Sequence, residues 1–463
     1  MKHLLQFFPW ACAVLILCGA ADPHHTRNIP QAGAQAAVSI IATAAPAFLP
    51  LAALSQGAER FPEGAQLELV RAGKAELLLP GFFESADASV SFDATRVIFT
   101  GKKYTRDHWQ IWEMRLADRF VRKIASADTD LIRPLYLPGD RAVYARRTAD
   151  GFQMESASLN DSEPFQLTHL HANALPVDVL QDGRILFESG YPLGTSGSPE
   201  LYLDYSDGSG VESVRCDHGC ARWGGRQLVY GAAAGDVVFT HGQTLSRFTS
   251  PLATETPVAA PSVEYAGALA ETPSGAWVVS ERVSVRSRFA LALLQPGVAT
   301  LRVLLADRDH NLVEPAVVAP RPVPNRHPSG LHDWTSANLL ALDVRESRDG
   351  ALSGKPVKVR LDAQNADGSA MTLGYAPVEP DGSFYVTTPG DRPLRFTLLD
   401  AHGATLRAER GWFWVRSGEQ RICVGCHAGP ERAPENRVPE ALLRSTIPVN
   451  LSGRAPGTAA GGR

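Results

Sequence analysis

The segments "SFDATRVIFT" (Ser91–Thr100) and "VLQDGRILFE" (Val179–Glu188) decide the fold class, because each joins a short turn to a strand of alternating apolar residues. Three more segments of this type begin at Tyr136, Ala221 and Ala270. In chain order the five starts are 45, 43, 42 and 49 residues apart, a period typical of the four-stranded blades of a β-propeller. Since one blade cannot bury both of its faces, the repeats predict a closed ring of six or seven blades. A β-sandwich with coincidental spacing is the alternative.

The predicted fold is all-β, with an N-terminal β-propeller over residues 61–320 and a smaller domain after it. Five prolines between Asn311 and Trp334, together with a loss of periodicity, mark the boundary and predict an interdomain linker at residues 321–337. Alternating strand patterns resume over residues 338–408. They predict a small β-sandwich-like domain.

The run Cys423-Val-Gly-Cys426-His427 is the strongest chemical motif in the sequence. A Cys-x-x-Cys pair serves zinc sites, dithiol redox couples and, when His follows directly, covalent attachment of a c-type haem. Zinc would need a second cysteine pair, and a redox couple would need a βαβ context that the preceding aromatic stretch does not offer. The haem interpretation uses every residue, with two thioethers and an axial imidazole. It predicts one haem c on a segment at residues 409–445, with a plain disulfide and zinc as alternatives.

Residues near the motif are candidates for contacts with the haem. Trp412 and Trp414 share one face of a strand by their spacing of two, and they either pack against the porphyrin or fill the core of the β-domain. Arg416, like Arg410 and Arg421, has a guanidinium that can pair with a haem propionate. Candidates for a sixth iron ligand are His327, His332 and His402.

The N-terminus predicts export, which covalent haem attachment requires. Residues 1–21 have a basic start, an apolar run and small residues before Asp22, the layout of a secretory signal peptide. Cys18 offers lipidation as an alternative, and a lipid anchor there is the only membrane attachment that the sequence predicts. Residues 22–60 are rich in Ala and Pro and predict a linker or a short surface helix rather than a membrane span. At the other end, residues 446–463 predict a disordered tail.

The composition agrees with an exported, periplasmic globular protein. The chain has 45 Lys and Arg against 49 Asp and Glu, a net charge of −4 and no basic run, so we expect no nucleic-acid partner. Besides the motif and two cysteines in the predicted signal peptide, the chain contains Cys216 and Cys220. In an oxidising compartment these two predict a small-loop disulfide, with a metal site that uses His218 as the alternative.

Several short runs surround the motif: "DGSFYV" from Asp381, "LLDAHG" from Leu398, "GWFWVRSGEQRICVGCH" from Gly411 and "ENR" ending at Arg437. Together they resemble the hydrazine synthase alpha subunit family. The resemblance implies a β-propeller followed by a haem-bearing middle domain. It also implies a difference, because in the hydrazine-forming enzyme a tyrosine four residues after the motif histidine coordinates the iron, whereas Glu431 stands there in this chain. The unusual iron ligation and its chemistry are therefore not expected to carry over.

Three functions are compatible with the sequence. The first is electron transfer by a monohaem c-type cytochrome-like protein, whose propeller docks a redox partner protein or a small-molecule substrate. The second is a haem-dependent oxidoreductase with an open iron site, which acts on a small nitrogen or oxygen compound. The third is a non-redox binding or scaffold protein with a Cys423–Cys426 disulfide. Because the nearest methionine is Met371 and no histidine outside the motif demands ligation, we expect a five-coordinate or weakly ligated iron.

Overall fold

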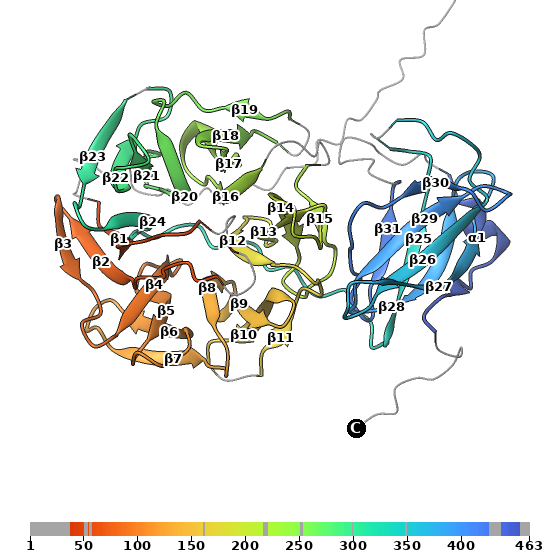
Figure 1. Ribbon diagram of the computed structural model, residues 1–463, viewed down its shortest axis with the longest axis horizontal. Helices are drawn as coiled ribbons and strands as arrows, with labels where there is room; N and C mark the ends of the chain where they lie inside the picture. The colour runs from red at the N-terminus through yellow and green to blue at the C-terminus, as the bar shows by residue number, and fades with distance from the viewer. Residues whose placement is uncertain are drawn as a thin grey trace, which may run out of the picture. The chain divides into compact units, whose positions relative to one another are not determined.

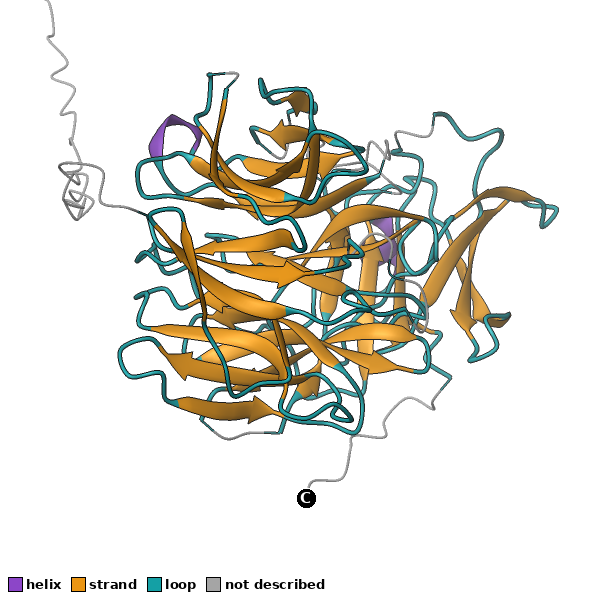
Figure 2. Cartoon of the chain, turned by 60° about the vertical axis from the view of Figure 1, so that its left-hand side comes forward, coloured by secondary structure: helices purple, strands orange, loops and turns teal. Residues whose placement is uncertain are grey.

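The computed structural model of the protein describes residues 38–50, 54, 58–160, 163–215, 221–250, 253–298, 300–347, 350–425 and 437–453. Within these residues the chain forms eight four-stranded β-sheets and two short helices, the 3-10 helix η2 (Gly231–Ala233) and the α-helix α1 (Glu440–Arg444). Figure 2 shows how strands dominate the fold. The all-β prediction is confirmed.

Six of the sheets are the blades of a β-propeller (Figure 1). Five blades are continuous in sequence and pair their strands antiparallel in chain order. They are β4 (Glu84–Val90), β5 (Arg96–Lys102), β6 (Gln110–Arg115) and β7 (Val121–Ala125); β8 (Leu131–Leu137), β9 (Arg141–Thr148), β10 (Gly151–Ser158) and β11 (Phe165–Gln166); β12 (Leu175–Val179), β13 (Ile185–Tyr191), β14 (Ser198–Asp204) and β15 (Glu212–Ser213); β16 (Arg222–Gln227), β17 (Val237–His241), β18 (Thr244–Phe248) and β19 (Thr256–Pro257); and β20 (Glu264–Glu271), β21 (Trp277–Arg282), β22 (Ala290–Leu294) and β23 (Leu301–Leu305).

The sixth blade closes the ring by joining the two ends of the propeller chain. Its inner strand, β24 (Asn311–Val317), pairs antiparallel with β1 (Ile40–Ala45), which in turn pairs with β2 (Gln66–Arg71), and β3 (Lys74–Leu77) is outermost. The prediction of six or seven blades is thus confirmed, with six. Because both ends of the propeller chain share one sheet, each needs the other for its backbone hydrogen bonds.

Strand β1 corrects the prediction that residues 22–60 are linker or surface helix. All six of its residues are buried. Alternate side chains enter different cores: Ile40 packs with Val278 of one neighbouring blade, whereas Ile41 packs with Phe99 of the other. A strand covered on both faces reads as a continuous apolar run without polar alternation, which is why the alanine-rich sequence concealed it.

One of the five predicted repeats is out of phase with the others. Four of them span the turn between the first and second strands of a blade, but the repeat at Ala221 coincides with β16, the first strand itself. The corresponding turn precedes β17 and includes η2, Gly235 and Asp236. The pair Gly224-Gly225 belongs to an irregularity inside β16, where the pairing register shifts between Trp223 and Arg226, and it was mistaken for a turn.

Irregularities of this kind recur in every blade. The pairing between the inner strand (β4, β8, β12, β16, β20 or β24) and its neighbour shifts register once in each of the six sheets. In five of the inner strands a residue in this region has a positive φ: Asp87, Arg133, Gly224, Gly267 and Glu314. A bulge turns the local backbone and redirects a side chain, so the six inner strands present irregular segments towards one another around the propeller axis.

The last two sheets form the small domain as a β-sandwich, and its apolar core lies between them. One sheet has the order β31-β25-β28-β32, and the other has the order β27-β26-β29-β30. Their bounds are β25 (Ser336–Ala341), β26 (Lys358–Gln364), β27 (Ala370–Pro377), β28 (Phe384–Pro389), β29 (Leu394–Leu399), β30 (Thr405–Ala408), β31 (Gln420–Cys423) and β32 (Val449–Asn450). The prediction of a sandwich-like domain after the propeller is confirmed.

Strand β32 corrects the prediction of a disordered tail from residue 446. Val449 and Asn450 pair parallel with Val386 and Thr387 of β28, and Leu451 is buried. The chain therefore returns to the sandwich after α1 and adds an edge strand to the sheet that begins with β31.

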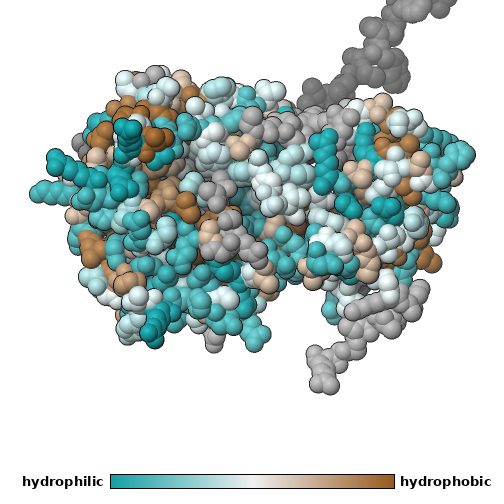
Figure 3. All heavy atoms as spheres, viewed as in Figure 1, coloured by the Kyte–Doolittle hydropathy of each residue, from teal (hydrophilic) through white to brown (hydrophobic). Residues whose placement is uncertain are grey.

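The surface mixes polar and apolar side chains, as the modest net charge predicts. Figure 3 shows hydrophobic side chains gathered over the blade of β20–β23, where Val283, Val285, Val298 and Val303 are exposed. In the described part of the chain, no helix has the length and apolar character needed to cross a membrane.

Candidate functional site

Strand β31 carries the first cysteine of the predicted haem motif at the edge of the sandwich. It pairs parallel with β25, with Ala341 opposite Cys423. Because side chains alternate along a strand, Gln420 and Ile422 face one way and Arg421 and Cys423 the other. Ile422 is 66% exposed, whereas Cys423 is half-buried and packs against the apolar core of the sandwich. The Cys423 thiol is thus held by a regular strand.

Arg421 is the polar neighbour of the Cys423 thiol. Its guanidinium hydrogen-bonds the Val211 carbonyl of the propeller and lies 3.9 Å from the Glu419 carboxylate. Burial raises the pKa of the Cys423 thiol, and the adjacent Arg421 charge lowers it only in part. The thiol is therefore protonated at neutral pH.

The backbone after Cys423 is fixed to a loop that follows β25. The Leu342 and Asp343 amides donate hydrogen bonds of 2.9 and 3.2 Å to the Cys423 and Val424 carbonyls. At Gly425 a Cβ atom would lie only 2.6 Å from the Glu346 carbonyl oxygen and 2.7 Å from that of Asp343. Only glycine permits this close approach, which explains the small residue before Cys426.

The far side of the motif is fixed by Asp381, which lies in the turn between β27 and β28. Its carboxylate accepts hydrogen bonds from the Arg437 guanidinium and, at 2.8 Å, from the Glu440 amide. Arg345 links the two attachments, since its guanidinium binds the Asp343 carboxylate at 2.7 Å and the Asp381 carbonyl at 2.7 Å. Burial alone would raise the pKa of Asp381, but these hydrogen bonds and those from Ser383 hold the pKa below its usual value. An ionised carboxylate therefore anchors the chain that follows residues 426–436.

The two tryptophans before the motif lie between the sandwich and the propeller. Trp414 is fully buried, its indole N–H donates a 3.0 Å hydrogen bond to the Gly208 carbonyl, and its ring packs 6.4 Å from that of Phe187. Trp412 is buried with the Arg395 guanidinium over its ring at 4.5 Å. These contacts agree with a packing role, and contact with a porphyrin stays a prediction.

Arg416 also lies at this boundary, and its guanidinium already has protein partners. It binds the Asp391 carboxylate at 2.6 Å, the Asp207 carbonyl at 3.0 Å and the His169 ring at 2.8 Å. A haem propionate would have to compete with the Asp391 carboxylate for this guanidinium. The pairing of Arg416 with haem stays a prediction.

The three histidines proposed as sixth ligands lie in different surroundings. His332 Nε2 accepts a 3.0 Å hydrogen bond from the side-chain amide of Gln420 of β31, and its ring stacks on Trp334 at 4.3 Å. His327 stacks on Tyr205 at 4.0 Å, and His402 is exposed in a turn closed by Asp400. Of the three, only His332 contacts the strand that carries Cys423, and none is tested as a ligand.

Several predicted residues lie outside the described part of the chain. They are Cys426, His427 and Glu431 of the motif, the pair Cys216 and Cys220 with His218, and the predicted signal peptide with Cys18. Among the described residues, no group of three or more His, Cys, Asp and Glu side chains could hold a metal ion.

The propeller axis contains a buried ionic network that the sequence analysis missed. Arg133 binds the Glu314 carboxylate at 2.7 Å, while Arg60 binds Glu314 at 2.9 Å and also binds Asp87. Burial raises the pKa of the nearby Glu188 to about 7, against a hydrogen bond from the Gly224 amide and the charges of Arg133 and Arg60. A signal was present, because Arg133 and Glu314 are each a charged residue directly before proline within an apolar run.

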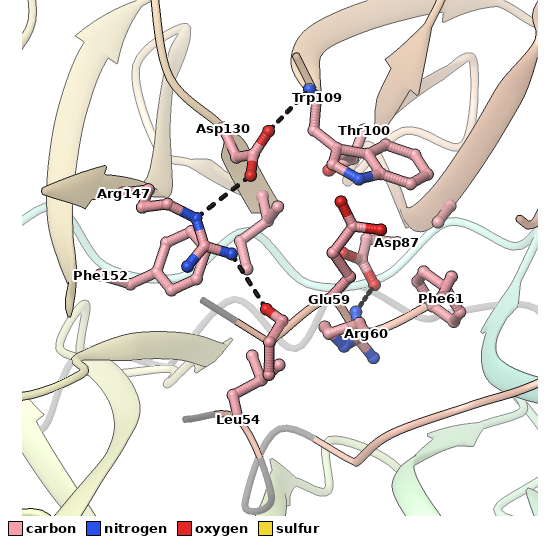
Figure 4. A pocket seen from close by; sticks show the side chains of 13 residues that line it. Leu54, Glu59, Arg60, Phe61, Asp87, Thr100, Trp109, Asp130, Arg147 and Phe152 are labelled. Atoms are coloured by element: carbon pink, nitrogen blue, oxygen red, sulfur yellow. Dashed lines mark hydrogen bonds and ion pairs between the residues drawn. The ribbon is translucent and has the colours of Figure 1, made fainter. Parts of the chain in front are cut away.

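A hollow of about 340 Å³ lies beside this network (Figure 4). Arg60 and Asp87 face each other at one side, and the aromatic rings of Phe61, Trp109 and Phe152 line other parts of the wall. Asp130 bridges the Trp109 amide and the Arg147 guanidinium, at 3.2 and 3.1 Å. The residues that line this hollow belong to the propeller and its N-terminal approach.

Fold and site together define the class of this protein: a six-bladed β-propeller followed by a β-sandwich, with a Cys-x-x-Cys-His motif that begins at the edge of the sandwich. Residues 344–428 match the family model of the hydrazine synthase alpha subunit middle domain. This range includes Arg345, Asp381 and the whole motif, so the resemblance to the hydrazine synthase alpha subunit is confirmed.

Two further comparisons point to the same relative. Over 60 residues, 13% of this chain and 7% of the relative, the sequence is 37% identical to the hydrazine synthase subunit alpha of Kuenenia stuttgartiensis, so the match spans a small part of that protein. The solved structure of Kuenenia stuttgartiensis hydrazine synthase superposes with a TM-score of 0.73 at 16% identity, covering 88% of this chain and 71% of the other. At this identity the superposition establishes a shared fold.

Proposed function

We propose that this protein is an exported c-type haem protein, in which Cys423 and Cys426 form thioethers to one haem and His427 provides an axial ligand. The observation that carries the proposal is the arrangement of β31 and Asp381, which fixes the chain on both sides of the motif to one corner of the sandwich. When bound, the haem supplies a one-electron couple whose electron passes to or from a redox partner.

The described residues fit such a group. Cys423 is a protonated, half-buried thiol at the end of a strand, and Ile422 and Val438, on either side of residues 426–436, are 66% and 60% exposed. Large exposed aliphatic side chains on both flanks suit a flat apolar ligand that covers them. Arg421 lies beside Cys423 and would hold its thiol in position for thioether formation, while its pairing with a haem propionate stays a prediction.

Electron transfer is the role that this arrangement supports best. Glu419, the acid next to Arg421, accepts hydrogen bonds from the Arg416 and Gly210 amides at 2.7 and 3.1 Å, so it is committed to the protein backbone. General acid–base catalysis needs a side chain that is free to exchange a proton with substrate. Export follows from the predicted signal peptide, and the propeller is the proposed docking surface for the partner.

The test is haem staining after denaturing electrophoresis of protein produced in a host with a haem c maturation system. We expect persistent staining of the wild type, a weakened stain for Cys423→Ser or Cys426→Ser, and no stain when both are replaced. Cys216→Ser is the matched control, because it removes a cysteine from the propeller and leaves the motif intact. A colourless wild type would refute the proposal and favour the disulfide-bonded scaffold.

Ligand binding separates the electron carrier from the haem-dependent enzyme. Ferrous spectra with and without carbon monoxide report whether the second axial position is open. A spectrum that carbon monoxide leaves unchanged would mean a protein-supplied sixth ligand and would exclude the enzyme. Replacement of His332 by Ala, with His402→Ala as the control, then shows whether the histidine bound to β31 is that ligand.

A further inference from the structure

A second hollow of the propeller, distinct from that in Figure 4, has about 680 Å³ of empty space. It is lined by the C-terminal ends of inner strands β4, β12, β16, β20 and β24 and by the chain that leaves β24. We call it the axial pocket and define it by Asp178, Arg226, Tyr230, Glu271 and Arg321.

Arg321 is the cation of the axial pocket that lacks an acceptor. Its backbone amide donates a 2.9 Å hydrogen bond to the Phe92 carbonyl, and its guanidinium lies over the Phe92 ring at 4.4 Å. The preceding carbonyl, that of Pro320, accepts a 2.6 Å hydrogen bond from the Tyr230 hydroxyl. The backbone is thus fixed at Pro320 and Arg321, while no described residue accepts a hydrogen bond from the partly buried guanidinium.

The carboxylates of the axial pocket already accept hydrogen bonds from other residues that line it. Asp178 accepts hydrogen bonds of 2.8 Å from both the Arg226 guanidinium and the Gln227 amide. Glu271 accepts hydrogen bonds from the Val229 and Tyr230 amides, at 2.6 and 3.2 Å. Both carboxylates of the axial pocket therefore have hydrogen-bond donors, whereas the Arg321 guanidinium has no acceptor among the described residues. The unpaired positive charge of the pocket lies at Arg321.

Electrostatics support this assignment. Burial lowers the pKa of Arg321 to about 10, and Arg226 acts in the same direction, against Asp178 and Tyr230. The group is still charged at neutral pH. A partly desolvated guanidinium without a hydrogen-bond acceptor is costly unless an anion completes its hydrogen bonds.

We propose that the axial pocket binds a small organic anion, whose carboxylate or phosphate group pairs with the Arg321 guanidinium. The Arg226 guanidinium, which is paired with Asp178, lines the same pocket, and the Tyr230 ring offers an apolar wall for the remainder of the ligand. The proposal concerns the propeller and does not depend on haem binding.

The test is calorimetric titration of the full chain at constant ionic strength, with inorganic phosphate and succinate as probes and chloride as the blank. At least one probe should bind the wild type saturably, and Arg321→Gln should weaken it about tenfold or more, the loss of a charge-assisted hydrogen-bonded pair. Arg302→Gln, an exposed arginine of β23, is the matched control and should leave binding unchanged. Binding of one probe alone identifies the anionic group.

Two results would overturn the proposal: no saturable binding of either probe, or equal affinity of the wild type and Arg321→Gln. Urea unfolding without a probe gives an independent check. If the role of Arg321 is to bind a ligand, Arg321→Gln removes a charge that has no hydrogen-bond acceptor, and the urea midpoint stays the same or rises. If Arg321 instead holds the chain after β24 in place, the midpoint falls, and the binding site is refuted.

Discussion

The propeller axis and the Cys423 corner of the sandwich both contain arginine–carboxylate networks, but they differ in burial. In the axis the side chains of Arg133 and Glu314 are each 6% exposed. In the corner, Arg345 is 49% and Arg437 31% exposed. Charges without access to water depend on one another for solvation, whereas exposed charges keep most of theirs. The network of Arg133 and Glu314 therefore determines whether the propeller folds. The network of Arg345 and Arg437 fixes only the short stretches of chain on either side of the motif.

The largest effect is expected at the axis. Arg133→Met leaves Glu314 and Asp87 with Arg60 alone, and removal of one partner from a buried network costs about 3 to 5 kcal/mol. Urea unfolding measures the change, and Arg302→Met, at an exposed site, should stay within about 0.5 kcal/mol of the wild type. Adding Glu314→Gln should cost less than the sum of the single changes, because the two residues interact. If Arg133→Met lowered the unfolding free energy by less than about 1 kcal/mol, as expected for an exposed ion pair, the buried network would not be the more important of the two for stability.

Glu188 makes the axis sensitive to pH. Its pKa in the folded protein is about 7, against an ordinary glutamate pKa of 4.5, so the folded state binds the proton more tightly. The resulting stabilisation is complete below pH 4.5 and is lost as the pH rises through 7, a change of about 3 kcal/mol. Relative to Glu188→Gln, the wild type should be more stable at pH 5 than at pH 7.5. If the unfolding free energies of the two proteins changed with pH in parallel, a raised pKa of Glu188 would be ruled out.

Trp414 connects the two regions, and an intermediate effect is expected there. Trp414→Phe keeps a ring but removes the indole N–H, which leaves the Gly208 carbonyl without this donor and costs about 1 to 2 kcal/mol of unfolding free energy. Trp334→Phe is the control, because Trp334 is 43% exposed and stacks only on His332 among the rings of the described chain. Equal effects of the two substitutions would show that the hydrogen bond across the boundary carries no energy.

The smallest effect on stability is expected at Asp381. Asp381→Asn keeps the shape but weakens the bonds to Arg437 and the Glu440 amide, at a cost of about 1 kcal/mol. Hydrogen exchange should accelerate locally at Glu440 and Ala441. Asp367→Asn, in a turn where Asp367 bonds only Ser369 and its own loop, is the control. Unchanged exchange at Glu440 would exclude Asp381 as the anchor.

Sequence patterns predicted the elements whose signal is local. The turn-and-strand repeats at Ser91, Tyr136 and Val179 predicted the blades. The spacing of Cys423, Cys426 and His427 is an equally local signal, but covalent haem attachment there stays a prediction. The blade number, six or seven, was left open, because ring closure depends on pairing between β24 and β1, which lie at opposite ends of the propeller chain.

Other features depend on tertiary context. Ile40–Ala45 forms a strand because two neighbouring blades cover it, and no property of an alanine-rich hexapeptide announces that burial. Trp414 and Trp412 were expected on one strand face, but whether such side chains contact a haem, a core or another domain depends on what folds beside them. The same holds for Arg321, which the sequence places among prolines and the fold places in a pocket.

The measurement that tests the central claim most directly is the mass of the tryptic peptide Ile422–Arg432 from the exported protein, digested after denaturation without reductant. A covalently attached haem increases the mass of this peptide by one haem group, because both cysteines of the motif lie within it. We predict that the peptide carries this mass in the wild type and in Cys216→Ser. A peptide of unmodified mass with a Cys423–Cys426 disulfide, from a host that matures haem c, would contradict the account.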